Sequence, residues 1–179
     1  MKYAIELFYD EETEAKLFSL AKKVADANLS TKYLEWKTRP HVTLACFNDV
    51  NEEKCIEKLK VFAKTHKAAP ANLESIGMFN DTKVIFISPT MNRSMFKLHE
   101  ELHICMEEFD KEGWNWYCPD DWVPHCAIVL AREDEEEVFY KASDLILHEF
   151  QKIFGQFTRV GLVKITFPVE EIFIVELGK

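Results

Sequence analysis

The sequence predicts an α+β fold, with two pseudo-symmetric lobes of antiparallel sheet and flanking helices around a central cleft. The motif "RPHVTLACF" at 39–47 has a partial repeat, "VPHCAIVLA" at 123–131, so that His41 and His125 are separated by close to half of the chain. The order of strand and helix patterns also nearly repeats. Because 47% of the 179 residues are hydrophobic and 14 are Phe, the chain can fill one interior. A single two-lobed domain over 1–179 is therefore expected.

The elements follow from periodicity and from turn signals. Residues 2–9 predict a strand, and 10–29 a helix with acidic residues in its first turn, where they favour the helix dipole. A β-prone run at 41–47 precedes a helix at 51–66. Strands at 72–79 and 83–89 are joined by "NDT", which is typical of a hairpin turn.

The second half repeats this order. A helix at 92–113 ends near Gly113. The second motif begins a strand at 125–131, a helix follows at 133–154, and two strands at 156–167 and 170–177 close the chain. No Gly/Ser-rich linker separates the halves, which favours one shared fold.

The composition excludes several classes of protein. A formal charge of −9 argues against non-specific binding to long nucleic-acid duplexes, because such binding needs many Lys and Arg contacts to phosphate. The same charge permits binding of a small anionic ligand in a local cleft. The five cysteines are odd in number and show no CxxC spacing, so neither a disulfide framework nor a zinc knuckle is indicated. The N-terminal residues turn acidic by Asp10, too early for a signal peptide, and no apolar run is long enough to span a bilayer. We expect a cytoplasmic monomer.

Strand geometry suggests what the histidines do. Side chains alternate faces along a strand, so His41 and Thr43 share one face, and Val42, Leu44 and Cys46 the other. In the second copy His125 and Ala127 share a face, while Cys126, Ile128 and Leu130 are expected to point inward. If the two strands lie side by side, the imidazoles face one another across one site.

Two facing imidazoles suit cleavage of a phosphodiester. A neutral ring takes a proton from water or a ribose hydroxyl while a protonated ring gives one to the leaving oxygen, and an ordinary pKa near 6.5 makes both forms accessible. The Thr43 hydroxyl can stabilise charge on a phosphoryl oxygen. This chemistry requires no metal and no cofactor.

These residues resemble the 2H phosphoesterases, which include 2′-5′ RNA ligase-like proteins and cyclic nucleotide phosphodiesterases. The family signature is two copies of His, any residue, Thr or Ser, and an apolar residue, in two pseudo-symmetric lobes. "HVTL" at 41–44 fits in full, whereas "HCAI" at 125–128 has Ala127 in the hydroxyl position. The resemblance implies hydrolysis of a 2′,3′-cyclic or 2′-5′ phosphodiester on an RNA end or small nucleotide, with His41 and His125 as acid and base and Thr43 on the phosphate.

Several further side chains are candidate substrate-binding residues. Phe79 lies where members of the family often carry an aromatic residue near the cleft, and it could stack on a base, as could Trp122 just before the second motif or Tyr117. Arg39, together with Lys37, leads into the first motif and could attract phosphate. Core packing and ordinary surface charge are the competing interpretations of these residues.

Two other functions compete with this one. Ala127 removes a hydroxyl donor, which favours a catalytically weak nucleotide-binding or regulatory domain. "HEELH" at 99–103 matches the HExxH pattern of zinc metalloproteases. However, the position of the third ligand in the extended motif is Phe109, and Leu98, Leu102 and Cys105 mark an ordinary amphipathic helix. We therefore expect no metal site.

Overall fold

The computed structural model describes residues 2–131 and 135–178. Its strands are β1 (Tyr3–Tyr9), β2 (His41–Phe47), β3 (Ala69–Phe79), β4 (Val84–Pro89), β5 (Cys126–Leu130), β6 (Ile153–Lys164) and β7 (Glu170–Glu176). Its α-helices are α1 (Glu11–Asp26), α2 (Lys32–Glu35), α3 (Glu52–Thr65), α4 (Arg93–Cys105) and α5 (Glu136–Glu149), and two 3₁₀ helices are η1 (Glu107–Glu112) and η2 (Asn115–Tyr117).

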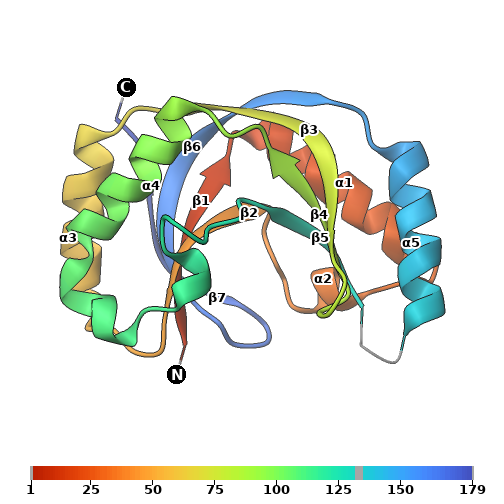
Figure 1. The fold of residues 1–179 in the computed structure, drawn as a ribbon, viewed down its shortest axis with the longest axis horizontal. Coiled ribbons are helices and arrows are strands. Elements are labelled where there is room, and N and C mark those ends of the chain that lie inside the picture. Colours follow the sequence, from red (N-terminus) through yellow and green to blue (C-terminus); the bar gives the residue numbers. More distant parts are fainter. Residues whose placement is uncertain (1, 132–134, 179) are drawn as a thin grey trace.

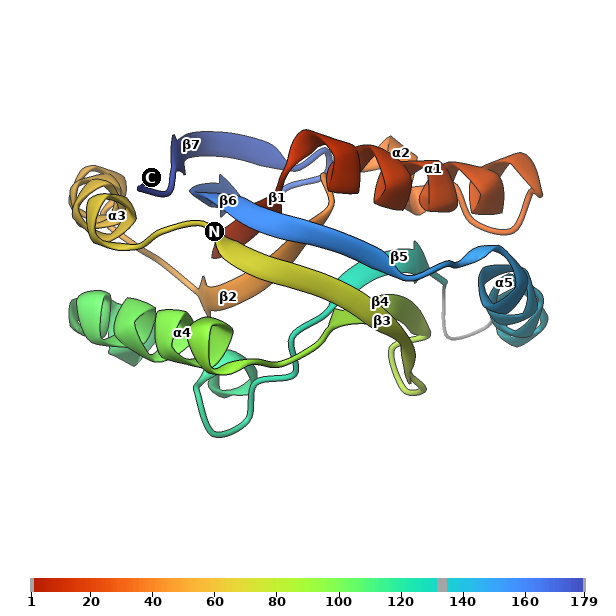
Figure 2. The same ribbon diagram turned by 90° about the horizontal axis from the view of Figure 1, so that it is seen from above.

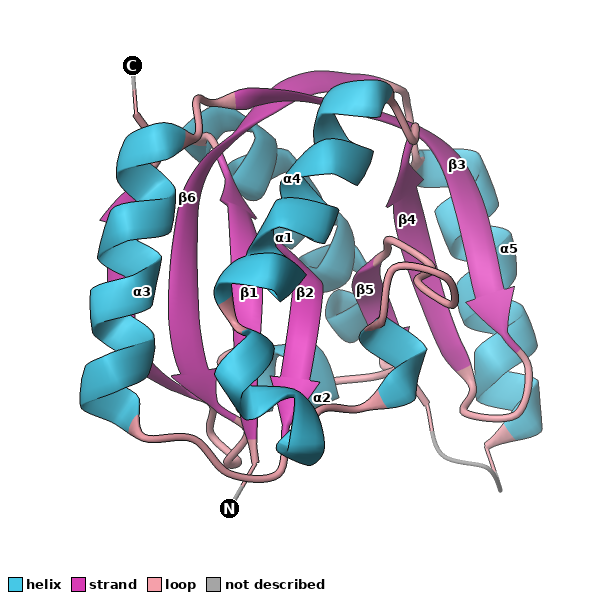
Figure 3. Cartoon of the chain, turned by 60° about the vertical axis from the view of Figure 1, so that its left-hand side comes forward, coloured by secondary structure: helices cyan, strands magenta, loops and turns pink. Residues whose placement is uncertain are grey.

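The strands form one antiparallel sheet in the order β2-β1-β6-β3-β4-β5, with β7 also paired to β6. The long strand β6 joins the two halves: its first part pairs with β3, and its later part pairs with β1 and β7. Figure 2 shows β6 crossing the molecule, and Figure 3 shows β1 and β2 on one side with β3 and β4 on the other. The predicted α+β fold is confirmed.

The helices interlock the two halves. Helix α1 follows β1 but packs on β5 and α5, whereas α4 follows β4 but packs on β2 and α3. In Figure 1, α3 and α4 accordingly lie on the left and α1 and α5 on the right. Each half therefore supplies a crossover helix to the other, which fixes the position of β2 relative to β5.

The element order was predicted correctly, but several boundaries were wrong. The last helix ends at Glu149 rather than 154, because Ile153 and its neighbours enter β6. The α4 segment ends at Cys105, and the chain continues as 3₁₀ turns. The short helix α2 was not predicted, and at four residues it leaves little periodic signal.

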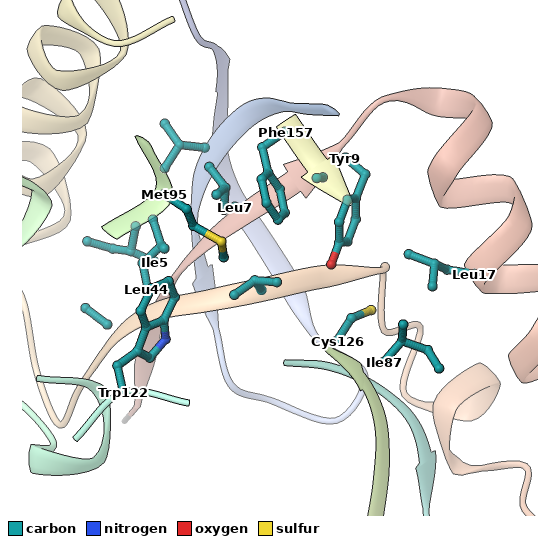
Figure 4. Packing of buried hydrophobic residues seen from close by; sticks show 14 of the residues in the cluster. Ile5, Leu7, Tyr9, Leu17, Leu44, Ile87, Met95, Trp122, Cys126 and Phe157 are labelled. Carbon is teal, nitrogen blue, oxygen red and sulfur yellow. The ribbon is translucent and has the colours of Figure 1, made fainter. Parts of the chain in front are cut away.

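The buried cluster lies between the sheet and the helices. Figure 4 shows Trp122 beside Leu44 at one end of this core, and the Tyr9 hydroxyl directed towards Cys126 at the other. Leu17, Leu20 and Val24 are buried on α1 as their spacing predicts. No helix in the described part of the chain is long and apolar enough to cross a membrane.

A β-bulge interrupts each motif strand at the same motif position. On β2, Thr43 is opposite Glu6 and Ala45 is opposite Ile5, so Leu44 has no direct partner. The same shift occurs on β5, where Ala127 is opposite Phe86 and Val129 is opposite Ile85. In both motifs the unpaired residue is the fourth, Leu44 or Ile128.

The bulges correct the predicted alternation of side chains. An extra residue in a strand shifts every later side chain to the other face. Cys46 therefore packs with Ala4 and Phe8 in a separate small cluster, not with Leu44 in the main core. On β5, Val129 is fully buried in place of the predicted Leu130, which is half-buried.

The two histidines of HEELH contact the backbone carbonyl of the bulge in β2. His99 is fully buried, stacks on Trp122 with ring centroids 3.7 Å apart, and donates from Nε2 to the carbonyl of Leu44 at 2.8 Å. The Nε2 of His103 lies 3.2 Å from the same oxygen. Within residues 2–131 and 135–178, no group of three or more potential ligand side chains could hold a metal ion. This geometry gives the two histidines a structural role.

We predict that His99→Leu destabilises the protein by about 1–3 kcal/mol, because a buried carbonyl loses its hydrogen-bond donor. Urea denaturation would measure this loss. Burial, reinforced by His103, lowers the pKa of His99 to about 4. Between the ordinary value near 6.5 and about 4, the unfolded chain binds a proton that the native state does not, so wild-type stability falls as pH falls. The variant should lose this component.

His148→Leu is the control, because this side chain is 75% exposed and its replacement should change stability by less than about 0.5 kcal/mol. Equal stability of His99→Leu and wild type across this pH range would contradict a structural role for the buried ring.

Candidate active site

The two motif histidines lie at the start of neighbouring strands. His41 is the first residue of β2, and His125 immediately precedes β5. The strands contact one another, and the backbone of His41 faces the thiol of Cys126. His41 is also close enough to lower the pKa of His125. The fold therefore brings the two motifs together. We call the surface that carries His41, Thr43, His125 and Ala127 the motif face.

Each imidazole is held by the same hydrogen bond. The Nδ1 of His41 donates to the carbonyl of Arg39 at 2.6 Å, and the Nδ1 of His125 donates to the carbonyl of Val123 at 2.6 Å. In each case a proline lies between donor and acceptor, and it holds the preceding residue in an extended conformation. A carbonyl can only accept, so these bonds place the ring hydrogen on Nδ1 and leave Nε2 for chemistry. The proline of each motif thus constrains the residue whose carbonyl accepts this bond.

The surroundings of the two rings differ. The Nε2 of His41 lies 3.3 Å from Oε1 of Glu6, and the ring of Phe8 approaches His41 edge-on. His125 instead meets Phe79 and Phe86, with ring centroids 4.9 and 5.2 Å away. His41 thus lies beside a carboxyl group, whereas His125 lies beside two aromatic rings.

Both imidazoles favour the neutral form. Burial lowers the pKa of His41, and the hydrogen bond to Arg39 partly opposes this. Burial likewise lowers the pKa of His125, with the bond to Val123 opposing and the charge of His41 adding to the effect. At neutral pH an unprotonated Nε2 is therefore the predominant form of each ring, as a general base requires.

Thr43 follows His41 on the same face and is half-buried. Among the described residues, none forms a hydrogen bond with its hydroxyl group, so the hydroxyl is free to donate to a ligand. The matching position on β5 is Ala127, which has no donor. The motif face therefore offers one hydroxyl where two-fold symmetry would place two.

The structure brings one candidate substrate-binding residue to a histidine. The half-buried ring of Phe79 lies edge-on to His125, with an interplanar angle of 89°. Trp122 is only 8% exposed, and its indole donates to the carbonyl of Thr43 at 2.9 Å. This placement makes Trp122 a packing residue beneath β2 rather than a ring offered to a base.

The guanidinium group of Arg39 is paired with two carboxylates. Its Nε lies 3.1 Å from both oxygens of Glu14, its Nη1 lies 3.6 Å from Glu171, and its guanidinium lies over Phe8. Arg39 therefore stabilises the approach to β2 through ion pairs. A phosphate group would have to compete with Glu14 for it.

Two hollows flank β2. One of about 440 Å³ lies beside residues 45–47 and is lined in part by Trp114 and Cys118. The other, of about 620 Å³, lies at the opposite end of the strand and is lined in part by residues 37–40. Neither His41 nor His125 is among the residues that line these two hollows.

Sequence reasoning missed Glu6 and Phe86. Glu6 is the only acidic residue in the apolar run that forms β1, and this was the available signal. Phe86 gives no such signal within an apolar strand. Their positions beside the histidines depend on cross-strand register, which one sequence does not reveal.

Comparisons with known proteins identify the family of the chain and agree with its fold. A family model described as the 2′-5′ RNA ligase superfamily matches residues 13–179. Similar solved structures include TT0787 of Thermus thermophilus, at 17% identity with 100% of each chain covered and a TM-score of 0.61. Another is E. coli LigT complexed with ATP, at 14% identity, covering 99% of this chain and 98% of LigT, with a TM-score of 0.57.

The same E. coli protein complexed with 3′-AMP matches with a TM-score of 0.56, again at 14% identity with 99% of this chain and 98% of that chain covered. At such identities these neighbours establish the fold only. No curated protein sequence matches this chain. Since the family model spans nearly all of the sequence, including both histidine motifs, the chain belongs to the 2′-5′ RNA ligase superfamily.

Proposed function

We propose that the protein is a metal-independent phosphoesterase that acts on 2′,3′-cyclic or 2′-5′ phosphodiesters of RNA ends or small nucleotides. His41 and His125 serve as general acid and general base, and Thr43 donates to a phosphoryl oxygen. The observation that carries this proposal is the matched anchoring of the two imidazoles, each by Nδ1 to the carbonyl two residues earlier. Such anchoring orients both Nε2 atoms and fixes their tautomer, as acid-base catalysis requires.

The reaction needs one proton removed and one delivered. One Nε2 takes a proton from water, or in the reverse direction from a ribose hydroxyl, as that oxygen attacks phosphorus. The other imidazole supplies a proton to the oxygen that leaves as its bond to phosphorus breaks. Because two imidazoles provide both transfers, no metal-bound water is required.

Small nucleotides fit this site better than long nucleic acid. The chain carries a net charge of −9, and Arg39 is paired with Glu14 and Glu171. A continuous phosphate backbone would find few cations here. E. coli LigT was solved in complexes with ATP, NADP+ and 3′-AMP, which makes a nucleotide a reasonable ligand class for this fold.

Ala127 supports a second candidate function. With one hydroxyl donor instead of two, the site could bind a nucleotide without efficient turnover. Loss of one oxyanion donor typically costs roughly a hundredfold to a thousandfold in rate. The two candidate functions differ in whether bound nucleotide is hydrolysed.

We expect His41→Ala and His125→Ala each to lower kcat by about 10²–10⁴-fold, because each removes one of the two proton transfers. Turnover of 2′,3′-cyclic nucleotides and a 2′-5′ dinucleotide, measured with EDTA present, tests this expectation. His148→Ala, at an exposed position on α5, is the matched control and should retain activity.

Turnover by the wild type that is abolished by EDTA would contradict metal independence. Turnover that persists undiminished in either histidine variant would contradict the acid-base pair. Nucleotide binding without turnover by the wild type would favour the binding-domain alternative.

For the hydroxyl donor, we predict that Thr43→Val lowers kcat by roughly a hundredfold while Thr43→Ser retains most activity. Ala127→Thr should raise kcat, because it adds the donor at the symmetry-related position. Steady-state kinetics on the best substrate would measure both. Equal kcat for Thr43→Val and Thr43→Ser would show that the hydroxyl does not contact the reacting phosphate.

A further inference from the structure

The two halves of the site differ at the position opposite the third residue of each motif. Glu6 on β1 is opposite Thr43, and Phe86 on β4 is opposite Ala127. From these matched positions, each side chain reaches the histidine two residues earlier on the facing strand. Glu6 places Oε1 3.3 Å from Nε2 of His41, whereas Phe86 places its ring centroid 5.2 Å from that of His125. The pseudo-symmetric site is therefore chemically asymmetric.

We propose that Glu6 is a positioning residue that shares a proton with His41, making His41 the general acid and leaving His125 as the general base. This assignment rests on the proposed function, and it goes further by giving each histidine its own role.

The environment of Glu6 favours a carboxyl group that retains its proton. Glu6 is 6% exposed. Burial, with repulsion from Glu171, raises its pKa to about 8, and Arg39 partly opposes this. Arg39 is itself paired with Glu14 and Glu171, so it neutralises Glu6 only in part. The other titratable groups that face Glu6 are His41 and Cys46 on β2, Tyr33 on α2, Tyr117 on η2 and Cys126 on β5.

A protonated Glu6 can donate to Nε2 of His41, because the ring hydrogen of His41 lies on Nδ1. Since Nδ1 of His41 donates to Arg39, its Nε2 carries a lone pair and has no proton of its own to give. Oε1 of Glu6 lies 3.3 Å from that nitrogen, a distance over which its carboxyl group can supply the proton. The pair then holds one transferable proton at no net charge, which a buried site tolerates better than a lone imidazolium ion.

The surroundings of His125 suit a base. Phe79 and Phe86 pack against its ring, and Gly77 makes room for Phe86, because a Cβ there would lie 2.2 Å from the Phe86 ring. No carboxylate in the described part of the chain is ion-paired with His125. An apolar wall opposes the charged form, so the ring enters the reaction neutral.

In the proposed hydrolysis each proton that moves has a donor and an acceptor. Nε2 of His125 takes a proton from water as the water oxygen bonds to phosphorus. Nε2 of His41 first takes the proton of Glu6, and it passes this proton to the leaving ribose oxygen as the bond from phosphorus to that oxygen breaks. The site is left with a protonated His125 and an ionised Glu6. Solvent returns the proton from one to the other, and one water has been consumed.

The test compares the pH profile of kcat/KM, which reports groups of the free enzyme, in wild type and Glu6→Gln. In the wild type we expect activity to rise as His125 loses its proton below pH 6.5 and to fall near pH 8 as the pair loses its transferable proton. In Glu6→Gln only His41 can hold that proton, and its pKa is lowered by burial. The alkaline limb should move below pH 6.5, with activity then falling roughly tenfold per pH unit.

Two variants separate proton sharing from packing. Glu6→Asp keeps a carboxyl group and should restore an alkaline limb above neutral pH. Phe86→Leu changes the matched position beside His125 and should leave the alkaline limb at its wild-type pH. An alkaline limb of Glu6→Gln that coincides with that of wild type would overturn the assignment and leave the proposed function intact.

An NMR titration of the Glu6 side-chain carboxyl carbon provides a readout that needs no substrate. We expect its main titration step near pH 8, and a step near the ordinary value of 4.5 would overturn proton sharing. If the wild type turns over none of the phosphodiesters, the proposed function fails, and the catalytic assignment fails with it whatever the titration gives.

Discussion

The site depends on one residue in each motif strand that has no direct partner in the sheet. Leu44 and Ile128 occupy the fourth position of their motifs, and each bulge lets two successive side chains face the core. The histidine and the residue two positions later can then face outward, while the rest of the strand packs inward. The bulge of β2 also leaves a buried carbonyl that must be satisfied, and the paired histidines of α4 satisfy it.

The two bulges explain why the sequence predicts the order of the elements but not the face on which each side chain lies. Periodicity predicts the order of the main elements, and the repeated Pro-His motif indicates a two-fold relation between β2 and β5. A strict alternation of side chains between the two faces of a strand does not reveal a bulge, so the face predicted for Cys46 is wrong. The HEELH pattern shows a second limit of the sequence, because a short pattern cannot distinguish a metal ligand from a donor to a backbone carbonyl.

Only some of the candidate site residues near the motifs lie beside a histidine in the structure. Phe79 lies at His125, whereas Trp122 packs under β2 and Arg39 is held by carboxylates. A single sequence shows that these residues are close to a histidine along the chain, but not on which side of the strand they lie. Glu6 is distant from His41 in sequence and adjacent to it only through antiparallel pairing. Cross-strand neighbours of this kind require the register, which here is set by the bulge.

Pseudo-symmetry and asymmetry have separate origins in this molecule. The anchoring of Nδ1 is the same in both halves because each motif repeats the same local backbone geometry around its proline. The contacts around the two rings differ because β1 carries Glu6 at the position where β4 carries Phe86. The fold therefore provides two equivalent imidazoles, and Glu6 and Phe86 make them unequal.

The central claim is that both imidazoles are fixed with hydrogen on Nδ1 and a lone pair on Nε2. Long-range proton–nitrogen correlation spectra of the histidine rings in the ligand-free protein at pH 7.5 test this directly, with assignments from His41→Ala and His125→Ala. We predict the Nδ1–H tautomer for both rings. Hydrogen on Nε2 of either ring at that pH would contradict it.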